Sequence, residues 1–312
     1  MPAPPLAFAN NRAYVAAHFA LELDTGGNVG LFRSIEGGSL KADVVTYQTG
    51  GMHGQFRQLG KPKYDDLKLQ VGMAMSAPFY TWISRFFTGV PDTRSGAIVA
   101  ADFKYTERAR RTFSGALIKE VSFPKLDATD KSAAYMSVGV AVEHIDFTVG
   151  SGQQIKQNEG MPAQKLWASC NFRVSLDGYD CSRVSKVDAF TIKQNVIEHH
   201  VGGFRAPFKV PSRIDIPTIA FYLPEADAGP FYKRAMDVAA DGHPSGSTHG
   251  MIEILDNGGA TLAELAFRNS DILSVTPDRS DASSEEIKQV KVEVYSELMG
   301  FSYGNVGLGD LA

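Results

Sequence analysis

Histidine residues are the first candidates for chemistry in this sequence, and none of them completes a metal site. His243 and His249 could supply two metal ligands, but no nearby cysteine or pair of carboxylates completes the set. We therefore interpret this segment as a polar turn. His199 and His200 would point to opposite faces of an extended chain, which suits no single ion.

The other candidates for catalysis or cofactor binding are also incomplete. The glycine-rich segment 304–309 is similar to a nucleotide-binding loop, but no helix follows it, so a phosphate cradle is not expected. Cys170 and Cys181 could form a disulfide, although two free thiols in a reducing cytoplasm are the favoured interpretation. No pairing of cysteine with histidine has a recognisable third partner. The sequence thus predicts neither an enzyme nor a bound cofactor or metal.

The composition favours a globular protein with two hydrophobic cores. The chain has 312 residues, of which 44% are hydrophobic and 21% charged. The net charge of −4 is too small to argue for nucleic acid or an anionic membrane as a partner. No apolar run approaches the roughly 20 residues that a membrane helix needs, and the first residues lack the pattern of a secretory signal.

The second half of the sequence repeats the first, element by element, which indicates two similar domains. Phe19-Ala-Leu-Glu-Leu-Asp24 corresponds to Phe172-Arg-Val-Ser-Leu-Asp177, and the segment that begins at Phe79 corresponds to the one that begins at Phe231. Further single residues also recur in the same order. Phe113 corresponds to Phe267, and Pro124 to Pro277.

Both halves are predicted to consist of strands with one helix each. In the first half, Phe79, Trp82, Ile83 and Phe86 occur at helical spacing, and we interpret them as the core face of a helix at 78–88, not as a ligand cage. The helix expected in the second half spans 230–240. Strands are expected at 17–24, 29–35, 39–47, 64–72, 96–102, 110–121, 134–147, 169–176, 183–187, 189–197, 213–221, 250–255, 261–275 and 286–300.

The predicted fold class is mainly β (α+β), with two tandem sandwich or half-barrel domains and an outer helix on each. Long loops are expected at 48–63 and 199–211, and loops of this length inside a compact domain are often functional. The expected organisation is an N-terminal tail (1–16), a first domain (17–149), a linker (150–168), a second domain (169–303) and a C-terminal tail (304–312).

The first half resembles the tube subunits of contractile phage tails and related contractile injection systems. The resemblance covers about residues 17–147, and it lies in the order of the motifs: a Gly-Gly loop, a basic residue, a Lys-x-x-x-Tyr segment and a Trp-Ile helix. The residues that carry it are Phe19–Asp24, Gly30–Gly38, Val44–Gly51, Arg57–Leu59, Lys61–Leu69, Gly72, Trp82-Ile83 and Val142–Asp146. The second half departs from this pattern. It has Gly202-Gly203 and Arg205 in its loop, but it lacks the Lys-Pro-x-Tyr segment and the tryptophan.

The resemblance implies an assembly. Six tube-like domains would pair their edge strands into a closed ring around a large barrel, and the rings would stack into a tube. With two such domains on each chain, three chains would form a pseudo-sixfold ring, because closed cyclic symmetry satisfies every interface. Loop 48–63 would then reach the adjacent ring, although an ordinary solvated basic loop explains its composition as well. The stacking residues would be Gly50, Gly51, Arg57, Lys61, Lys63 and Tyr64.

The charge distribution is compatible with such a ring. Residues 1–150 contain 16 basic and 14 acidic side chains, whereas residues 151–312 contain 15 and 21. Opposite net charges on the two halves would favour alternating neighbours. Drift in solvated surface charge explains the same numbers equally well.

The function implied by the resemblance is that of a structural tube subunit, assembled in the bacterial cytoplasm and forming a conduit for DNA or cargo. Its partners would be further copies of itself and the sheath, baseplate and tail-terminator proteins. One alternative with the same fold is a trimeric baseplate hub or tube initiator. A third, from a different class, is a monomeric β-rich module that binds a carbohydrate or protein. The residues leave open whether the particle is a phage or an injection device.

Overall fold

The structure is a computed structural model that describes residues 15–24, 27–48, 55–155, 167–204, 206–241, 248–278, 287–304 and 306–307. It consists mostly of strands, accompanied by two helices, α1 (Ala77–Phe87) and α2 (Gly229–Asp241), and one short 3-10 turn (Glu225–Asp227). The predicted fold class, mainly β, is therefore confirmed. In the part of the chain described, no helix is long and apolar enough to cross a membrane.

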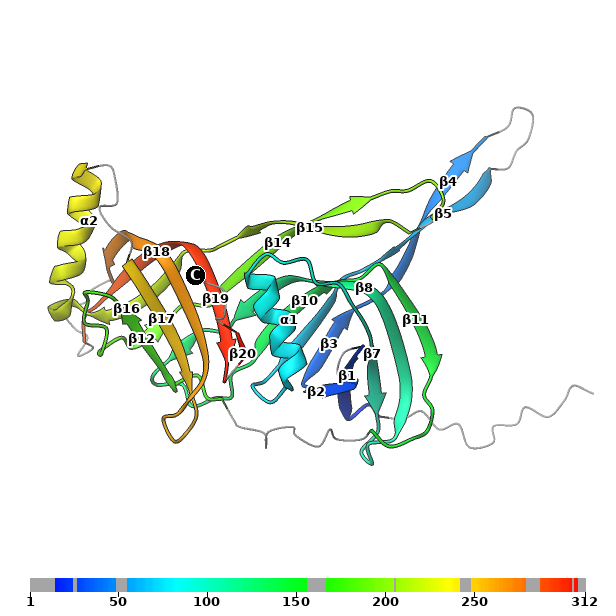
Figure 1. The fold of residues 1–312 in the computed structure, drawn as a ribbon, viewed down its shortest axis with the longest axis horizontal. Coiled ribbons are helices and arrows are strands. Elements are labelled where there is room, and N and C mark those ends of the chain that lie inside the picture. Colours follow the sequence, from blue (N-terminus) through cyan, green and yellow to red (C-terminus); the bar gives the residue numbers. More distant parts are fainter. Residues whose placement is uncertain are drawn as a thin grey trace, which may run out of the picture.

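The strands form two large sheets and one separate hairpin (Figure 1). Nearly all strand pairs are formed between strands of the same half of the chain. The first sheet contains β2 (Gly27–Phe32), β1 (His18–Leu23), β7 (Arg94–Ala101), β8 (Glu107–Phe123), β10 (Met136–Ala141), β6 (Leu67–Val71), β3 (Ser34–Gly37), β11 (His144–Val149), β14 (Phe190–His199) and β15 (Phe208–Asp215). The second contains β12 (Phe172–Leu176), β17 (Thr248–Leu255), β18 (Thr261–Pro277), β19 (Gln289–Tyr303), β16 (Ile219–Pro224), β13 (Lys186–Val187), β9 (Leu126–Asp127) and β20 (Val306–Gly307). Each large sheet nevertheless includes a contribution from the opposite half: β14 and β15 join the first sheet, and β9 joins the second. The hairpin is β4 (Leu40–Tyr47) with β5 (Phe56–Tyr64).

Helix α1 is a buried amphipathic helix. Pro78 stands in its first turn, where its missing N–H costs nothing, and Gly89, with a φ of 70°, follows its last turn. Its core face is formed by Phe79, Trp82, Ile83 and Phe86, all of which are buried. The indole nitrogen of Trp82 also donates a hydrogen bond of 2.9 Å to the carbonyl of Asp92, so this large side chain is fixed at both its apolar and its polar end.

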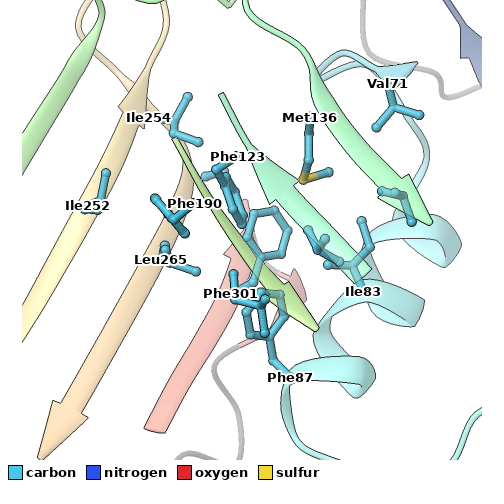
Figure 2. Close-up of a cluster of buried hydrophobic side chains, with 14 of the residues drawn as sticks. Val71, Ile83, Phe87, Phe123, Met136, Phe190, Ile252, Ile254, Leu265 and Phe301 are labelled. Carbon is cyan, nitrogen blue, oxygen red and sulfur yellow. The ribbon is translucent and has the colours of Figure 1, made fainter. Parts of the chain in front are cut away.

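The hydrophobic core is continuous from α1 to the second sheet. Figure 2 shows Ile83 and Phe87 of α1 beside Phe301 of β19, and the cluster continues through Phe123 and Phe190 to Leu265 and Ile254. The rings of Phe123 and Phe190 stack with their centroids 5.2 Å apart. The two halves therefore share one core instead of burying separate ones.

Equivalent details recur in the two halves at a constant spacing. Gly96 lies opposite Phe113 in the β7–β8 pairing, and Gly250 lies opposite Phe267 in the β17–β18 pairing, 154 positions later. A Cβ atom at either glycine would collide with the phenylalanine ring and with a neighbouring backbone carbonyl, so both positions require glycine. The β8–β10 ladder bulges at Lys119, and the β18–β19 ladder bulges at Leu273, again 154 positions later.

The two hairpins also match each other in register. β4 pairs Lys41 with Lys63 and then shifts register between Ala42 and Val44. β14 pairs Lys193 with Asp215 and shifts between Gln194 and Val196, so each position of this hairpin lies 152 after its counterpart. A bulge conserved in position within one chain identifies β14–β15 as the counterpart of β4–β5.

Several predicted boundaries are corrected. The predicted loop 48–63 is wrong in its second part, because Phe56–Tyr64 is strand β5, and the predicted loop 199–211 overlaps β14 and β15 at its ends. β4 is exposed along its whole length and β5 is exposed from Phe56 to Leu59, so no alternation of burial marks the start of β5 in the sequence. The expected strand 29–35 is divided into β2 and β3, and 134–147 into β10 and β11, which pair with different parts of β8 on either side of the positive-φ residue Gly115.

Candidate subunit interface

Among the described residues, those considered for chemistry are not brought together. His199 and His200 are exposed at the end of β14, and both cysteines are free thiols. His243 lies outside the described residues, as do residues 305, 308 and 309 of segment 304–309. No group of three or more metal-ligating side chains occurs within the described ranges.

One motif with a catalytic spacing was not recognised in the sequence. Gly300-Phe-Ser-Tyr-Gly304 has the Gly-x-Ser-x-Gly pattern of a nucleophile elbow, which requires a sharp turn between a strand and a helix. Here Ser302 lies within the extended strand β19 and is buried, and its hydroxyl donates a hydrogen bond of 3.2 Å to Glu264. The motif is a strand segment and not a catalytic turn.

The most informative surface is the contact between the two halves, residues 15–155 and 167–307. Strand β14 crosses from its own half and pairs antiparallel with the end of β8, placing Ile192 opposite Val121 and Phe190 opposite Phe123. Ile192 is 0% exposed. The hydroxyl of Thr191 bonds that of Ser122 at 2.9 Å. The hairpin of one half is thus an added strand in the sheet of the other.

Polar contacts fix this added hairpin farther along its length. The backbone N–H of Lys209 on β15 donates a bond of 2.6 Å to the carboxylate of Glu143, and its ammonium lies 3.4 Å from Asp66. Asp66 also pairs with Lys119 at 2.7 Å. In return, β9 of the first half pairs with β13 of the second. The halves therefore exchange strands in both directions.

A second contact covers helix α1. The rings of Tyr80 and Tyr303 stack with their centroids 3.7 Å apart. The ring centroids of Phe301 and Phe87 are 6.1 Å apart. The hydroxyl of Tyr303 donates a bond of 2.7 Å to the carbonyl of Met73. Burial of this cluster raises the pKa of Tyr80 well above its ordinary value. The end of β19 thus covers helix α1.

The β4–β5 hairpin has no such cover. Within the described residues, its two strands pair only with each other, and they extend away from the rest of the molecule (Figure 1). Leu40, the counterpart of the fully buried Ile192, is 63% exposed. Two-stranded hairpins alone are marginally stable in water, and exposed strand edges are templates for pairing with another chain.

The residues predicted to mediate stacking lie on or beside this hairpin. Gly50 and Gly51 fall outside the described residues. Arg57, Lys61 and Lys63 are exposed on β5, where Lys63 pairs with Asp43 at 3.2 Å. Tyr64 ends the strand, and its hydroxyl is 2.8 Å from Nδ1 of His144.

At the opposite end of the molecule, α2 and one edge of β18 are open. Helix α2 buries Phe231, but Met236 and Ala239 are exposed, in contrast to the buried face of α1. No described strand pairs with residues 274–277 of β18 on the side opposite β19. The counterparts of these residues in β8, 120–123, are the ones to which β14 is added. The molecule therefore has an unpaired hairpin at one end and an unoccupied place for such a hairpin at the other.

Comparison with known proteins confirms the resemblance for the first half. Residues 15–146 match the sequence model of the family described as T4-like virus tail tube protein gp19. No curated relative matches the chain.

Solved structures from contractile injection systems are similar to parts of the chain. One is a sheath/tube terminator of an extracellular contractile injection system, with 16% identity and a TM-score of 0.39, which covers 45% of this chain and 99% of its own. A sheath-tube complex of the same kind of system has 18% identity and a TM-score of 0.34, over 43% of this chain and 89% of its own. A baseplate structure of the anti-feeding prophage has 12% identity and a TM-score of 0.34, over 44% and 95%.

Proposed function

We propose that this protein is a structural subunit of a phage tail tube or of the inner tube of a contractile injection system. Two tube-like domains, at 17–149 and 169–303, would act as two of six positions in a ring, so that three chains close it. The family match over residues 15–146 supports the tube role. The strand exchange between the two halves supports the manner of closure.

The main observation in support of the ring is the pairing of β14 with β8 inside one chain. If the same relationship continues between chains, β4 of one chain pairs with the open edge of β18 in the next. The spacings of 152 and 154 then fix the register, which places Leu40 opposite Val275 as Ile192 lies opposite Val121. Such strand addition gives the exposed hairpin a sheet and removes both open edges.

The same register predicts a polar contact. Arg57 is the counterpart of Lys209, whose backbone N–H donates to the carboxylate of Glu143, and Glu297 is the counterpart of Glu143. Arg57 of one chain should therefore lie beside Glu297 of the next. The hairpin contact is head-to-tail, and such contacts form a closed ring only when the rotation between copies closes.

The rest of the proposed role concerns the assembled particle. Rings stacked through the tip of the hairpin, with Gly50, Gly51, Lys61 and Lys63 against the next ring, would form a conduit for DNA or cargo. The sheath, baseplate and terminator proteins would be its partners. Assembly would take place in the bacterial cytoplasm.

Light scattering and electron microscopy of the purified protein over a range of concentrations test the proposal. The expected result is that the smallest assembled species has the mass of three chains. In micrographs it should appear as a ring with pseudo-sixfold symmetry, and these rings should stack into tubes. Single rings that never stack would indicate a hub or initiator instead of a repeating subunit. A monomer at every concentration would contradict the ring and leave a β-rich binding module as the alternative.

A further inference from the structure

We infer that a second contact completes each junction between chains: strand β11 of one copy packs against helix α2 of the next, with Phe147 and Val149 as the apolar anchors. This inference deepens the proposed ring and rests on it. The occupant of both surfaces is a second copy of this chain.

The registers of two strand pairs show which residues of β11 and β19 are counterparts. In the β8–β11 ladder, Phe147 lies opposite Arg111 and Val149 opposite Ala109. In the β18–β19 ladder, Phe301 lies opposite Leu265 and Tyr303 opposite Ala263. Each residue of the second ladder is 154 positions after its counterpart in the first. Phe147 and Val149 therefore occupy the places of Phe301 and Tyr303.

These counterparts differ greatly in their exposure to solvent. Phe301 is 1% exposed because it packs on α1, whereas Phe147 is 68% exposed and Val149 is 86% exposed. Exposed large apolar side chains at neighbouring positions of one strand face form a patch that a partner covers more often than a scattered single residue does. Within this chain, the same strand position is covered by a helix.

The helices supply the matching surface. Tyr80 and Phe87 of α1, which contact Phe301 and Tyr303, correspond to Tyr232 and Ala239 of α2 at the spacing of 152. Tyr232 is only partly buried and Ala239 is exposed. The large side chain on the strand, Phe147, thus meets a small one on the helix, and Val149 lies over the Tyr232 ring.

The placement of the surfaces allows a head-to-tail contact. Figure 1 shows α2 at one end of the molecule and β11 at the other, on the same side as the β4–β5 hairpin. Both parts of the junction, hairpin on β18 and β11 on α2, therefore lie at the same two ends. The excess of basic residues in 1–150 and of acidic residues in 151–312 is compatible with this pairing of unlike ends.

A charge substitution tests the anchor. Phe147→Asp should abolish or strongly reduce closed rings, while the melting temperature of the single chain stays within about one degree of wild type, because an exposed side chain contributes little to folding. Phe103→Asp is the matched control: Phe103 is 73% exposed on a turn outside the proposed junction, and this variant should assemble normally. Rings that form equally well with Phe147→Asp would overturn the inference and leave the proposed function intact.

Cysteine crosslinking tests the pairing directly. In a chain with Cys170→Ser and Cys181→Ala, the pair Val149→Cys and Tyr232→Cys should give covalent dimers and trimers with a short bismaleimide reagent. The pair Thr148→Cys and Tyr232→Cys should not, because alternate residues of a strand point to opposite faces. Rings without a Val149–Tyr232 crosslink would refute the contact alone, whereas wild-type protein that forms no rings would refute the contact and the proposed function together.

Discussion

The guanidinium of Arg234 on α2 donates two hydrogen bonds to the carboxylate of Asp271 on β18. Nη2 lies 2.6 Å from Oδ2, and Nε lies 2.9 Å from Oδ1. The counterparts of these residues in the first half are Trp82 and Leu117, which are both buried apolar side chains. An ion pair in the second half thus takes the place of two buried apolar side chains in the first. It fixes a helix that has few buried side chains of its own.

We predict that Arg234→Ala lowers the free energy of unfolding of the chain by about 3 kcal/mol, because it leaves the buried carboxylate of Asp271 without its cation. Urea denaturation followed by circular dichroism measures the change. The double variant Arg234→Met with Asp271→Leu is the control, since an apolar pair of similar volume should recover most of the loss. A single variant as stable as wild type would show that the pair is energetically neutral.

The two hairpins predict opposite effects for one substitution. Ile192→Asp should lower the stability of the single chain by about 3 kcal/mol or more, because it places a charge in the core beside Val121. Leu40→Asp should leave the melting temperature unchanged and prevent ring formation. The comparison uses thermal unfolding for stability and light scattering for assembly. If Leu40→Asp assembles normally, the proposed pairing of β4 with β18 is wrong.

Charge reversal tests the predicted contact between Arg57 and Glu297. Arg57→Glu should weaken the trimer several-fold by setting two carboxylates beside each other, and adding Glu297→Arg should restore part of the affinity, because the charges attract again although the acceptor for the backbone N–H of residue 57 is lost. Sedimentation at several concentrations measures the dissociation constants. The difference between single and double variant should shrink as the salt rises from about 0.1 M to about 1 M, since the Debye length falls from about 10 Å to about 3 Å.

Local patterns in the sequence were sufficient to predict helix α1 and most strands. The spacing of Phe79, Trp82, Ile83 and Phe86 marks a helix face, and alternation marks strands that have one buried side. The start of strand β5 carries no such pattern, because its first residues are exposed on both faces. The register of each sheet depends on residues far apart in the chain, so no local pattern contains it.

The interface residues could not be identified from the sequence for the same reason. Ile192 and Leu40 occupy the same place in equivalent hairpins, and both read as ordinary core residues of a strand. Only the structure shows that one is buried against β8 and the other is exposed. What the sequence did contain was the repeat, and the constant spacing of 152 to 154 is what relates the exposed residues to their covered counterparts.

The two cysteines should differ in reactivity. Burial raises the pKa of the Cys181 thiol to about 11, whereas Cys170 is only partly buried. At a pH near 8 very little of Cys181 is thiolate, the form that reacts, so iodoacetamide should modify Cys170 many-fold faster. Mass spectrometry of peptides after timed alkylation measures both rates. In urea the two rates should become similar, and equal rates in the folded protein would contradict the buried position of Cys181.

Glu107 should make stability depend on pH in the acidic range. Its carboxylate accepts bonds of 2.8 Å from Arg110 Nε and from the hydroxyl of Ser151, and the Arg110 bond is the main reason that the pKa of Glu107 lies below its ordinary value. A carboxylate whose pKa is lower in the folded than in the unfolded chain stabilises the fold above the unfolded value. That contribution is lost as the pH falls through the folded value.

The variant Glu107→Gln isolates this effect. At neutral pH it should be about 1–2 kcal/mol less stable than wild type, since it loses charge-assisted bonds to Arg110. As the pH falls below about 4.5, the ordinary value for glutamate, the two proteins should converge, because protonation removes the same charge from wild type. Thermal unfolding at a series of pH values measures the gap. Glu36→Gln is the control, because Glu36 is an exposed carboxylate on β3. A gap for Glu107→Gln that stays constant with pH would show that packing, and not charge, accounts for the loss.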